Sequence, residues 1–556
     1  MIDAPTVPET VQPLNDELLE SVRIATSWDI VHRPATQGTF PARVHHTQRA
    51  LKALEQDLAL LRPSSGAAGN SNSALLELRA NARLLRAAVR GVSDQPRVIA
   101  RLPRVMLPAQ KDEPRAAAIA TAYLRAVDGD FSAPAFRELI RVLQTHDPLN
   151  LDELWNLPTF LKFVLLESLL DDARILMSLP GSAPGPSVAA HIKSLRAIAN
   201  ADWAHFLEPL ILFDATLRQD PAQAYGAMDF DSREFYRKRV AFIAHHSDCS
   251  EMQVAQAALD LAREGLTNPA NDARIQLRRI HVGYFLIDKG LPRIAAHTGF
   301  HPPFIDHARA FIRSQADNFY ITGIQLLTIF FIGALILLPL PHSSLFQCLI
   351  ASIALLTPVM QCAVDLVNNC VTALFDPDPL PKLDFSKGIP VNCTTVVAVP
   401  SLLLNEAQVQ GLIDDLEVRF LANRDPHLHF ALLTDLSDSV TKPHANDAHE
   451  LVELAVKGIE ELNAKYGSKS SGSFILLHRH RIFSPRQGVW MGWERKRGKL
   501  LDLNKLLMGE FDAFPIKAGR LDALMQARYV LTLDSDTQLP RGAAARMVGA
   551  IAHPLH

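Results

Sequence analysis

Two long apolar segments stand out in the middle of the chain. Between Asp317 and Asp365, 47 consecutive residues include no Asp, Glu, Lys or Arg. This charge-free stretch divides at LPLPHSS into two apolar spans, residues 320–338 and 345–364. Because a helix rises about 1.5 Å per residue, about 20 residues cross the roughly 30 Å hydrocarbon core of a bilayer. The pattern predicts a transmembrane helical hairpin over residues 318–366, with a buried hairpin of a soluble domain as the alternative.

The charged residues that flank the two spans predict the orientation of this hairpin. Arg309 and Arg313 precede the first span, Lys382 and Lys387 follow the second, and the turn between them has neither Lys nor Arg. Loops rich in Lys and Arg stay on the cytoplasmic side of a membrane. We therefore expect both long flanks to be cytoplasmic and the short turn to face outward.

The sequence before the hairpin has the period of amphipathic helices. In ALLELRANARLLRAAVRGV, apolar residues such as Leu75, Leu78 and Leu85 recur at steps of three and four, which places them on one face. We expect an N-terminal helical or flexible segment over residues 1–73 and an all-α cytoplasmic region over residues 74–315. The histidines of this region are dispersed, and no catalytic group of residues is recognisable in it.

After the hairpin the periodicity changes to that of short strands. Four apolar runs, rich in β-branched residues, Phe and Leu, are CTTVVAVPSLL (393–403), HFALLTDLSDS (429–439), SFILLH (473–478) and RYVLTLDSDT (528–537). Helical patterns lie between them. Strands that alternate with helices predict a parallel sheet in an α/β domain, here over residues 386–556. In such sheets, ligands bind beyond the carboxyl ends of the strands.

Composition narrows the classes of function. With 56 Lys and Arg against 59 Asp and Glu, the net charge is −3, which argues against a nucleic-acid partner. The five cysteines form no C-x-x-C or C…H spacing, so neither a disulfide scaffold nor a structural zinc site is expected. Two membrane spans provide no alternating-access cavity, which argues against a transporter.

Pairs of carboxylates follow two of the predicted strands. Asp435 and Asp438 end the second run, and Asp534 and Asp536 end the last. Alternate residues of an extended segment point the same way, so Asp534 and Asp536 can face one cation. Mg²⁺ and Mn²⁺ prefer oxygen ligands and often bridge carboxylates to substrate phosphates. We predict that Asp534 and Asp536 bind Mg²⁺ or Mn²⁺ next to a diphosphate.

A basic helix start lies upstream of the last strand, in ERKRGKLLDLNKLL (494–507). It opens with Arg495, Lys496, Arg497 and Lys499. Basic side chains and free backbone N–H groups at a helix N-terminus suit a diphosphate. Taken alone, this segment is better explained by a solvated basic helix start.

The order of these motifs resembles one family of enzymes. The pattern R-G-K-x-x-x-L-N, followed by a strand that ends in D-x-D, resembles the processive family-2 glycosyltransferases, which have the Rossmann-like GT-A fold. The segments HLHFALLTDLSDS, VWMGWERKRGKLLDLNKLL and YVLTLDSDTQLPRGAAARMVGAIAHPL resemble the glycosyltransferase region of the cyclic β-1,2-glucan synthases. LWNLPTFLKFVLLESL and HVGYFLIDKGLP are similar to upstream parts of the same family, so the resemblance extends from about residue 75 onward.

The resemblance implies inverting transfer of glucose from UDP-glucose to a growing β-1,2-glucan, at the inner (plasma) membrane of a bacterium. It implies that Asp534 and Asp536 hold the metal and the diphosphate. Asp435 would contact the uracil or ribose of UDP-glucose, and Asp438 would also bind UDP-glucose. Lys499 would approach the diphosphate or uridine, and Asn504 would order that loop.

Only 20 residues follow Asp536. An inverting transfer needs a general base that deprotonates the acceptor hydroxyl. In the family this residue comes further downstream, so we expect it beyond His556 and assign no catalytic residue within the chain. The GT-A domain would then be incomplete, and a separate chain with the missing C-terminal half would be a partner. The alternative is a catalytically inactive, membrane-anchored remnant or an interaction subunit.

Overall fold

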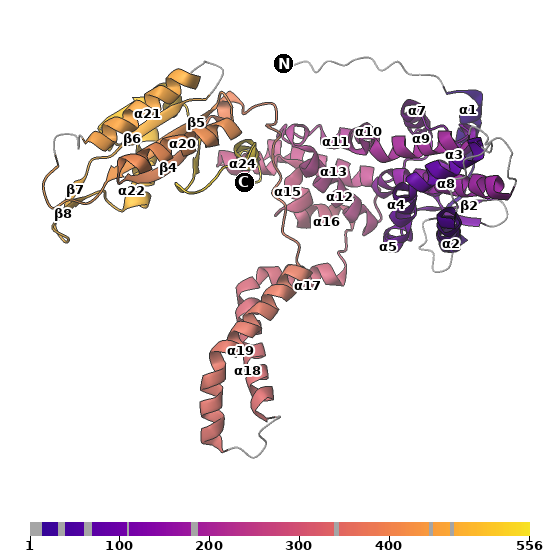
Figure 1. Ribbon diagram of the computed structural model, residues 1–556, viewed down its shortest axis with the longest axis horizontal. Coiled ribbons are helices and arrows are strands. Elements are labelled where there is room, and N and C mark those ends of the chain that lie inside the picture. Colours follow the sequence, from indigo (N-terminus) through magenta and orange to yellow (C-terminus); the bar gives the residue numbers. More distant parts are fainter. Residues whose placement is uncertain are drawn as a thin grey trace. The chain divides into compact units, whose positions relative to one another are not determined.

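The chain forms two compact units that alternate along the sequence. The computed structural model describes residues 14–31, 39–60, 69–107, 111–178, 187–337, 344–443, 449–466 and 472–556 (Figure 1). The first unit is composed of Met1–Gln219, Arg237–Asp260 and Arg293–His301. The second unit is composed of Asp220–Tyr236, Leu261–Pro292 and Pro302–His556.

The first unit is mostly helical, as the sequence predicts. The predicted apolar stripe is buried, with Leu78 and Leu85 at most 2% exposed. Helix α8 (Leu151–Ser178) is buried along much of its length, through side chains such as Phe160 and Leu165, which is typical of a core helix. The other helices of this unit are α1 (Asp16–Thr26), α2 (Thr39–Leu60), α3 (Gly69–Ala80), α4 (Ala82–Ser93), α5 (Pro96–Ile99), α6 (Arg115–Ala126), α7 (Ala133–Leu143), α9 (Ser187–Asn200), α10 (Trp203–Leu207), α11 (Asp214–Leu217) and parts of α12 (Phe230–His245), α13 (Glu251–Thr267) and α16 (Leu291–Thr298).

The expectation of a purely α-helical N-terminal region is wrong in one respect. Strands β1 (Ile30–Val31), β2 (Arg104–Leu107) and β3 (Lys111–Pro114) form a small antiparallel sheet. Each strand has two to four residues, which is too short to show the alternation by which a strand is recognised in a sequence.

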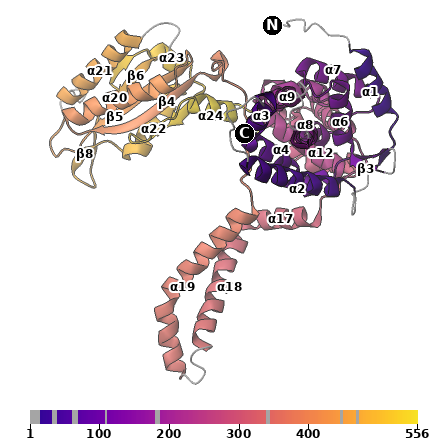
Figure 2. The same cartoon turned by 45° about the vertical axis from the view of Figure 1, so that its right-hand side comes forward.

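Two long helices of the second unit correspond to the predicted membrane spans. Helices α18 (Ala316–Leu337) and α19 (Leu345–Leu374) pack against each other (Figure 2). Ser344 begins α19 with a capping box, in which its hydroxyl accepts from the N–H of Gln347 and the Gln347 side chain accepts in return. The predicted turn at residues 338–343 lies outside the described residues. Only 11% of the residues in the apolar window of each helix are buried. Both helices are long and apolar enough to cross a membrane, and their exposure argues against a buried soluble hairpin.

The second unit also contains a mixed five-stranded sheet, with the strand order β10-β4-β5-β6-β9. The predicted runs form β4 (Thr395–Leu403), β5 (Leu428–Leu436), β6 (Phe474–His478) and β10 (Tyr529–Thr532), which are mutually parallel. The fifth strand, β9 (Ile516–Gly519), pairs antiparallel with β6 and was not predicted. A separate hairpin is formed by β7 (Ile482–Ser484) and β8 (Val489–Met491).

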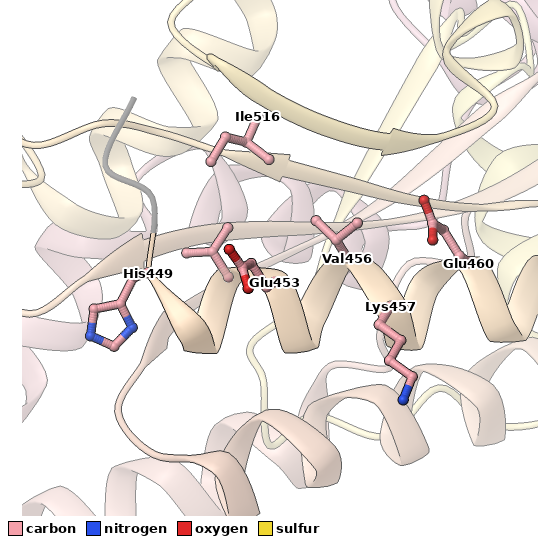
Figure 3. Close-up of a pocket in the computed structure, with 7 residues that line it drawn as sticks. His449, Glu453, Val456, Lys457, Glu460 and Ile516 are labelled. Carbon is pink, nitrogen blue, oxygen red and sulfur yellow. The ribbon is translucent and has the colours of Figure 1, made fainter. Parts of the chain in front are cut away.

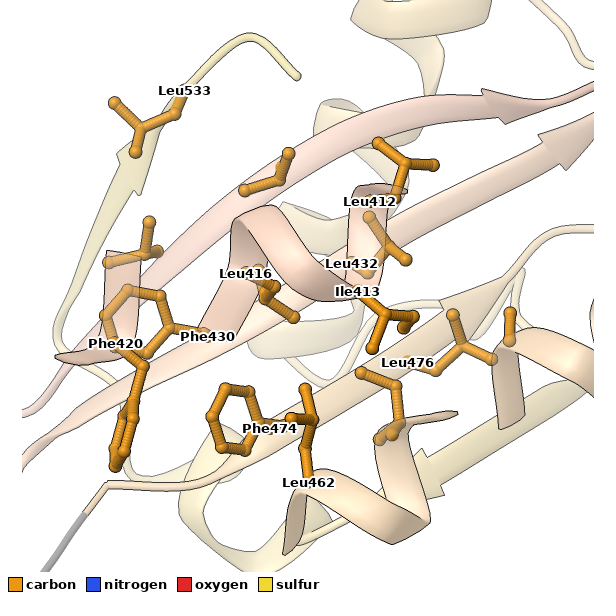
Figure 4. Close-up of a cluster of buried hydrophobic side chains, with 14 of the residues drawn as sticks. Leu412, Ile413, Leu416, Phe420, Phe430, Leu432, Leu462, Phe474, Leu476 and Leu533 are labelled. Carbon is orange, nitrogen blue, oxygen red and sulfur yellow. The ribbon is translucent and has the colours of Figure 1, made fainter. Parts of the chain in front are cut away.

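Helices cover both faces of the five-stranded sheet. Side chains alternate between the two faces along each strand, so each strand contributes residues to a core on either side. On one face, Phe430 and Leu432 of β5 pack against α20 (Glu406–Ala422) and α21 (Glu450–Tyr466) (Figure 4). On the other face, Ala431 and Leu433 pack toward α22 (Arg495–Leu507) and α23 (Leu521–Met525). The near-continuous burial of these strands is what a sheet covered on both faces requires.

A small helical subdomain, Asp220–Tyr236 and Leu261–Pro292, joins the sheet within the second unit. It includes α14 (Ala273–Arg279) and α15 (Val282–Ile287). The N–H of Asp384 donates to the carbonyl of Ala227 at 2.8 Å. The N–H of Leu383 donates to the carbonyl of Gly549, in α24 (Ala543–Ile551), at 3.0 Å. Residues 382–384 therefore link this subdomain to the last helix of the chain.

Candidate functional site

The strand order places a switch point at the carboxyl ends of β4 and β10. The connections from β4 through α20 to β5, and through α21 to β6, proceed in one direction across the sheet. The chain then returns to the opposite side of β4, where it forms β10. In open α/β sheets, ligands bind at such a reversal, beyond the carboxyl ends of the strands. Asp534 and Asp536 follow β10 directly, and Asp435 lies at the end of β5.

A buried group of charges lies under this edge of the sheet. The Arg479 guanidinium binds Asp435 with two hydrogen bonds, Nε to Oδ1 at 3.0 Å and Nη2 to Oδ2 at 2.9 Å. The Lys499 ammonium lies 3.0 Å from Oδ2 of Asp435 and donates to the carbonyl of Ser401, on β4, at 2.7 Å. Asp502 accepts from Nη1 of Arg479 at 2.9 Å. We call Asp435, Arg479, Lys499 and Asp502 the Asp435 group.

Burial affects the two cations of this group differently. Burial lowers the pKa of the Lys499 ammonium, and the adjacent Asp435 carboxylate offsets this only in part. Burial acts in the same direction on Arg479, but the hydrogen bonds and charges of Asp435 and Asp502 outweigh it and raise the pKa of its guanidinium. Arg479 is therefore a fixed positive charge beside Asp435, and Lys499 is the cation of this group whose pKa burial lowers.

The segment WMGWERKRGK (490–499) covers the Asp435 group. Its two glycines, Gly492 and Gly498, allow the backbone to approach the group closely. A Cβ atom on Gly492 would lie 2.5 Å from Oδ2 of Asp435. A Cβ atom on Gly498 would lie 2.0 Å from the carbonyl oxygen of Trp493 and 2.6 Å from Nη1 of Arg479. Any side chain at either position would displace the backbone from the buried ion pair. This close approach accounts for both glycines of the motif.

The backbone is strained where this segment enters α22. Glu494 and Arg495 both have positive φ angles, 45° and 37°, a region that residues with side chains seldom adopt. Such strain concentrates at functional sites, where the surrounding structure holds it in place. It turns the start of α22 toward the strand ends.

Exposed charges at the start of α22 meet the predicted ligand residues. The Lys496 ammonium forms an ion pair with Asp534, and the Arg495 guanidinium lies 3.1 Å from Asp438. Lys496 and Asp534 are each about half exposed, unlike Lys499 and Asp435 beneath them. The structure thus brings Asp435, Asp438, Lys499 and Asp534 to one end of the sheet. Asp435 and Lys499 form a buried layer, and Asp438 and Asp534 form a more exposed layer.

The loop after β10 is fixed from α20. The Arg419 guanidinium donates to the carbonyls of Ser535 and Thr537, which flank Asp536. Burial lowers the pKa of Arg419, although the charges of Asp415 and Asp536 raise it in part. Asp536 itself is exposed, like Asp534. This arrangement leaves both carboxylates open to solvent on a loop that is held by a buried cation.

Asn504 is separate from this group. It is exposed on α22, five residues after Lys499, and its side chain has no hydrogen-bond partner among the described residues. Sequence reasoning also missed Arg479, Asp502 and Arg419. Arg479 directly follows β6, and the rule that drew attention to Asp435 would have identified it.

The donor atoms at Asp534 and Asp536 fit a divalent metal that is shared with a phosphate ligand. Among the described residues, no three His, Cys, Asp or Glu side chains are grouped so as to hold an ion by themselves. Mg²⁺ usually binds one or two carboxylates together with substrate phosphates, so two exposed carboxylates suffice. The Lys496 ammonium beside Asp534 already shows that a cation is stabilised there.

A pocket elsewhere on the sheet contains none of the predicted residues. It lies between α21 and β9, has a volume of about 280 Å³, and is lined by Val456, Lys457 and Ile516 among others (Figure 3). Aliphatic side chains and isolated charges do not converge there on a ligand group. The carboxyl ends of the strands therefore remain the candidate site.

Comparison with known proteins supports the resemblance that the motifs indicate. No protein-family model matches the chain. The chain is 35% identical over 370 residues, 66% of its length, to the cyclic β-(1,2)-glucan synthase NdvB of Rhizobium meliloti (strain 1021). The matched region covers only 13% of that protein, so the chain spans a small part of the length of this relative. The resemblance to the cyclic β-1,2-glucan synthases is thus confirmed, and the chain is a relative of these enzymes.

Proposed function

We propose that this chain forms the donor-binding part of a membrane-bound glucosyltransferase that makes β-1,2-glucan. The proposal includes a GT-A-like fold for residues 386–556, UDP-glucose as donor and Mg²⁺ or Mn²⁺ as cofactor. The observation that carries it is the two-layered set of charges at the switch point of the sheet, where Lys496 and Asp534 lie above the buried Asp435 group. The relationship to a cyclic β-(1,2)-glucan synthase supports the same function.

Each residue of the site would have a distinct task in binding the donor. Asp534 and Asp536 would hold the metal ion, which neutralises the charge of the diphosphate leaving group. Lys496 would turn from Asp534 to the phosphates. Lys499 would supply a second positive charge from below, since Asp435 and the Ser401 carbonyl fix its position.

Asp435 would act mainly by positioning its neighbours. Its side chain is 1% exposed, and both of its oxygens are bound by Arg479. A carboxylate in that state shapes the pocket floor and fixes Lys499. Asp438 is more accessible and pairs with Arg495, so it would lie closer to the donor than Asp435. We therefore propose donor binding, rather than the whole transfer, as the task of this chain.

The proposed location is the inner membrane of a bacterium, with α18 and α19 as spans and the flanking units in the cytoplasm. Two apolar, largely exposed helices and the relationship to the glucan synthase support a membrane association. The lipid bilayer would then be a partner in addition to UDP-glucose and the growing glucan.

Titration calorimetry on the whole chain in detergent micelles tests donor binding. We expect UDP and UDP-glucose to bind in the presence of Mg²⁺ or Mn²⁺, and Asp534→Asn to weaken binding by roughly tenfold, equivalent to about 1.4 kcal/mol. Chelation of the metal should weaken binding to a similar extent. Asp414→Asn, a change of an exposed carboxylate on α20 that bonds only Gln410, is the matched control.

Two results would overturn the proposal. One is that neither UDP nor UDP-glucose binds to the folded chain. The other is that Asp534→Asn and Asp414→Asn have the same affinity as the unaltered chain. Absence of binding would favour the alternative function, an inactive membrane-anchored remnant or an interaction subunit.

A further inference from the structure

Helix α17 (Phe304–Ser314) precedes the first membrane span and is strongly amphipathic. At 100° per residue, its large apolar side chains fall on one arc of about 120°. This face consists of Phe304, Ile305, Ala308, Phe311 and Ile312. The remaining arc carries the charged and polar residues of the helix.

The apolar face of α17 is uncovered within the second unit. Phe304 is 86% exposed, Ile305 64% and Phe311 61%, and α17 has no buried residue. Three large exposed side chains on one short helix form an apolar patch of a kind that soluble surfaces rarely leave open. Some apolar surface must cover this face in the native environment.

Three contacts tie α17 to the end of the hairpin at which both spans leave the membrane. Its rings meet the first span, since Phe311 lies 5.8 Å from Phe319 near the start of α18. The Arg313 guanidinium lies 2.9 Å from Asp378, just after the end of α19, and 5.9 Å from the Phe375 ring. Helix α17 therefore contacts both the first turn of α18 and the segment that directly follows α19.

The chain also changes direction between α17 and α18. Gln315 ends α17 with a non-helical conformation, φ −123° and ψ 33°. Figures 1 and 2 both show α17 running across the end of the α18–α19 hairpin instead of continuing along it. A helix in this position lies parallel to the membrane surface when the hairpin crosses the membrane.

The charges on the polar face suit lipid headgroups. Arg309 and Arg313 outnumber the single acidic residue of the helix, Asp306. Amphipathic helices with basic polar faces lie in the interfacial plane, with the apolar face buried about 5–10 Å into the headgroup and acyl boundary. We propose that α17 is an in-plane interfacial helix, whose Phe304–Phe311 face inserts into the cytoplasmic leaflet of a membrane with anionic lipid. This proposal depends on the membrane location that is part of the proposed function.

Depth measurements with nitroxide labels test this proposal. The whole chain, with its five cysteines replaced by alanine, is reconstituted in nanodiscs of phosphatidylethanolamine and phosphatidylglycerol, and single cysteines are introduced for labelling. We expect labels at Phe304→Cys and Phe311→Cys to collide several-fold more with oxygen than with the water-soluble relaxant NiEDDA. Ala310→Cys and Ser314→Cys, on the polar arc of the same helix, should show the reverse preference.

Labels on the hairpin separate failure of this inference from failure of the membrane proposal. Ile329→Cys in α18 and Leu349→Cys in α19 are 69% and 58% exposed and should contact lipid. If these two sites favour NiEDDA, the membrane location itself is wrong. If they favour oxygen while the Phe304 and Phe311 sites favour NiEDDA, or are shielded from both reagents by protein, the interfacial helix is wrong.

A second measurement avoids replacement of the native cysteines. Phe311→Trp and Ala310→Trp are compared with the unaltered chain in nanodiscs that contain brominated lipid. We expect the added fluorescence of Phe311→Trp to be quenched strongly and that of Ala310→Trp to be quenched little. Equal quenching of the two added tryptophans would also overturn the proposal.

Discussion

Two buried polar groups of the second unit are each built around one aspartate, and they differ in what surrounds them. Asp435 lies at the sheet edge with Arg479 and Lys499, and exposed ion pairs lie above it. Asp220 lies in the helical subdomain. Its oxygens accept from Nδ1 of His281 at 2.7 Å and from the N–H groups of Ala224, Tyr225 and Val282.

The Asp220 group is closed, whereas the Asp435 group opens toward solvent. Nε2 of His281 hydrogen-bonds the Tyr236 hydroxyl at 3.0 Å, and the His281 ring lies 5.0 Å from that of His553. All of these side chains are buried and belong to the contact between the helical subdomain and the segment after α24. Burial of charge alone therefore does not identify a ligand site. The distinguishing feature is that α22, which supplies Lys499 to the buried group, also supplies Arg495 and Lys496 to exposed ion pairs with Asp438 and Asp534.

The largest effect on stability is expected when Arg479 is removed from the Asp435 group or Asp220 from the Asp220 group. Arg479→Met leaves Asp435 buried without its two hydrogen bonds from the guanidinium. Asp220→Ala leaves three backbone N–H groups and His281 without their acceptor. Both should lower the free energy of unfolding by about 3 kcal/mol or more. Only Arg479→Met should also weaken UDP binding, by roughly tenfold or more, because only the Asp435 group lies beneath the proposed donor site.

Thermal unfolding measures the stability of each variant, and calorimetry performed below its melting temperature measures the UDP affinity of the folded chain. Arg479→Lys keeps a positive charge but loses the paired hydrogen bonds, so its UDP affinity should be intermediate. If folded Asp220→Ala lost UDP binding as completely as Arg479→Met, the functional distinction between the two groups would fail.

An intermediate effect on the free energy of unfolding is expected when Gly498 is replaced, because this glycine lets α22 cover the Asp435 group. Gly498→Ala places a methyl group against the Trp493 carbonyl and the Arg479 guanidinium, and it should lower the free energy of unfolding by about 1–3 kcal/mol. Gly411→Ala is the matched control, since no atom lies within 4 Å of the added Cβ on α20. The control should raise stability by up to about 1 kcal/mol, because alanine is the better helix former. Urea unfolding curves that shift in the same direction for both variants would contradict this account of the motif.

The smallest effect is a pH dependence of the free energy of unfolding. It arises at the contact between the helical subdomain and the segment after α24, where His553 lies. Burial, together with the charges of His281 and His556, lowers the pKa of His553 to about 2. In the unfolded chain a histidine has a pKa of about 6.5. Between these values the unfolded state binds more protons than the folded state, so His553 makes stability fall as the pH drops below about 6.5, by up to about 1.4 kcal/mol per pH unit.

Melting temperatures measured between pH 7.5 and 5.0 check this contribution. His429 in the sheet also has a pKa lowered by burial, to about 4, so the unaltered chain contains both contributions. In His553→Phe, the melting temperature should depend less steeply on pH, because the contribution of His553 is removed and that of His429 remains. An unchanged slope in this variant would show that His553 is protonated in the folded state.

The sequence was most informative where one local pattern decided the structure. Long apolar runs predicted β4 to within about two residues and β5 to within about three, because strands buried on both faces are apolar along their whole length. Strand β9 was missed, since IKAG is short and pairs only through tertiary contact. The same reason explains the small antiparallel sheet of the first unit.

The candidate site shows a similar division. Position at the end of a strand drew attention to Asp435 and Asp534, and the structure brings both residues to one edge of the sheet. That Asp435 is 1% exposed could not be predicted, because its cover depends on the approach of Gly492 and Gly498 to a guanidinium from another strand. Whether a carboxylate meets ligand or supports a neighbour is decided by packing between distant segments.

The left-handed backbone at Glu494 and Arg495 has a consequence for protein engineering. Each such residue costs roughly 1–2 kcal/mol relative to glycine, so glycine substitutions here would be selected in any library that is screened by melting temperature alone. The same substitutions would remove the side chains that pair with Arg497 and Asp438. A screen for a more heat-resistant form of this chain should therefore score affinity for the proposed nucleotide ligand as well, or it will favour variants that have lost these two ion pairs.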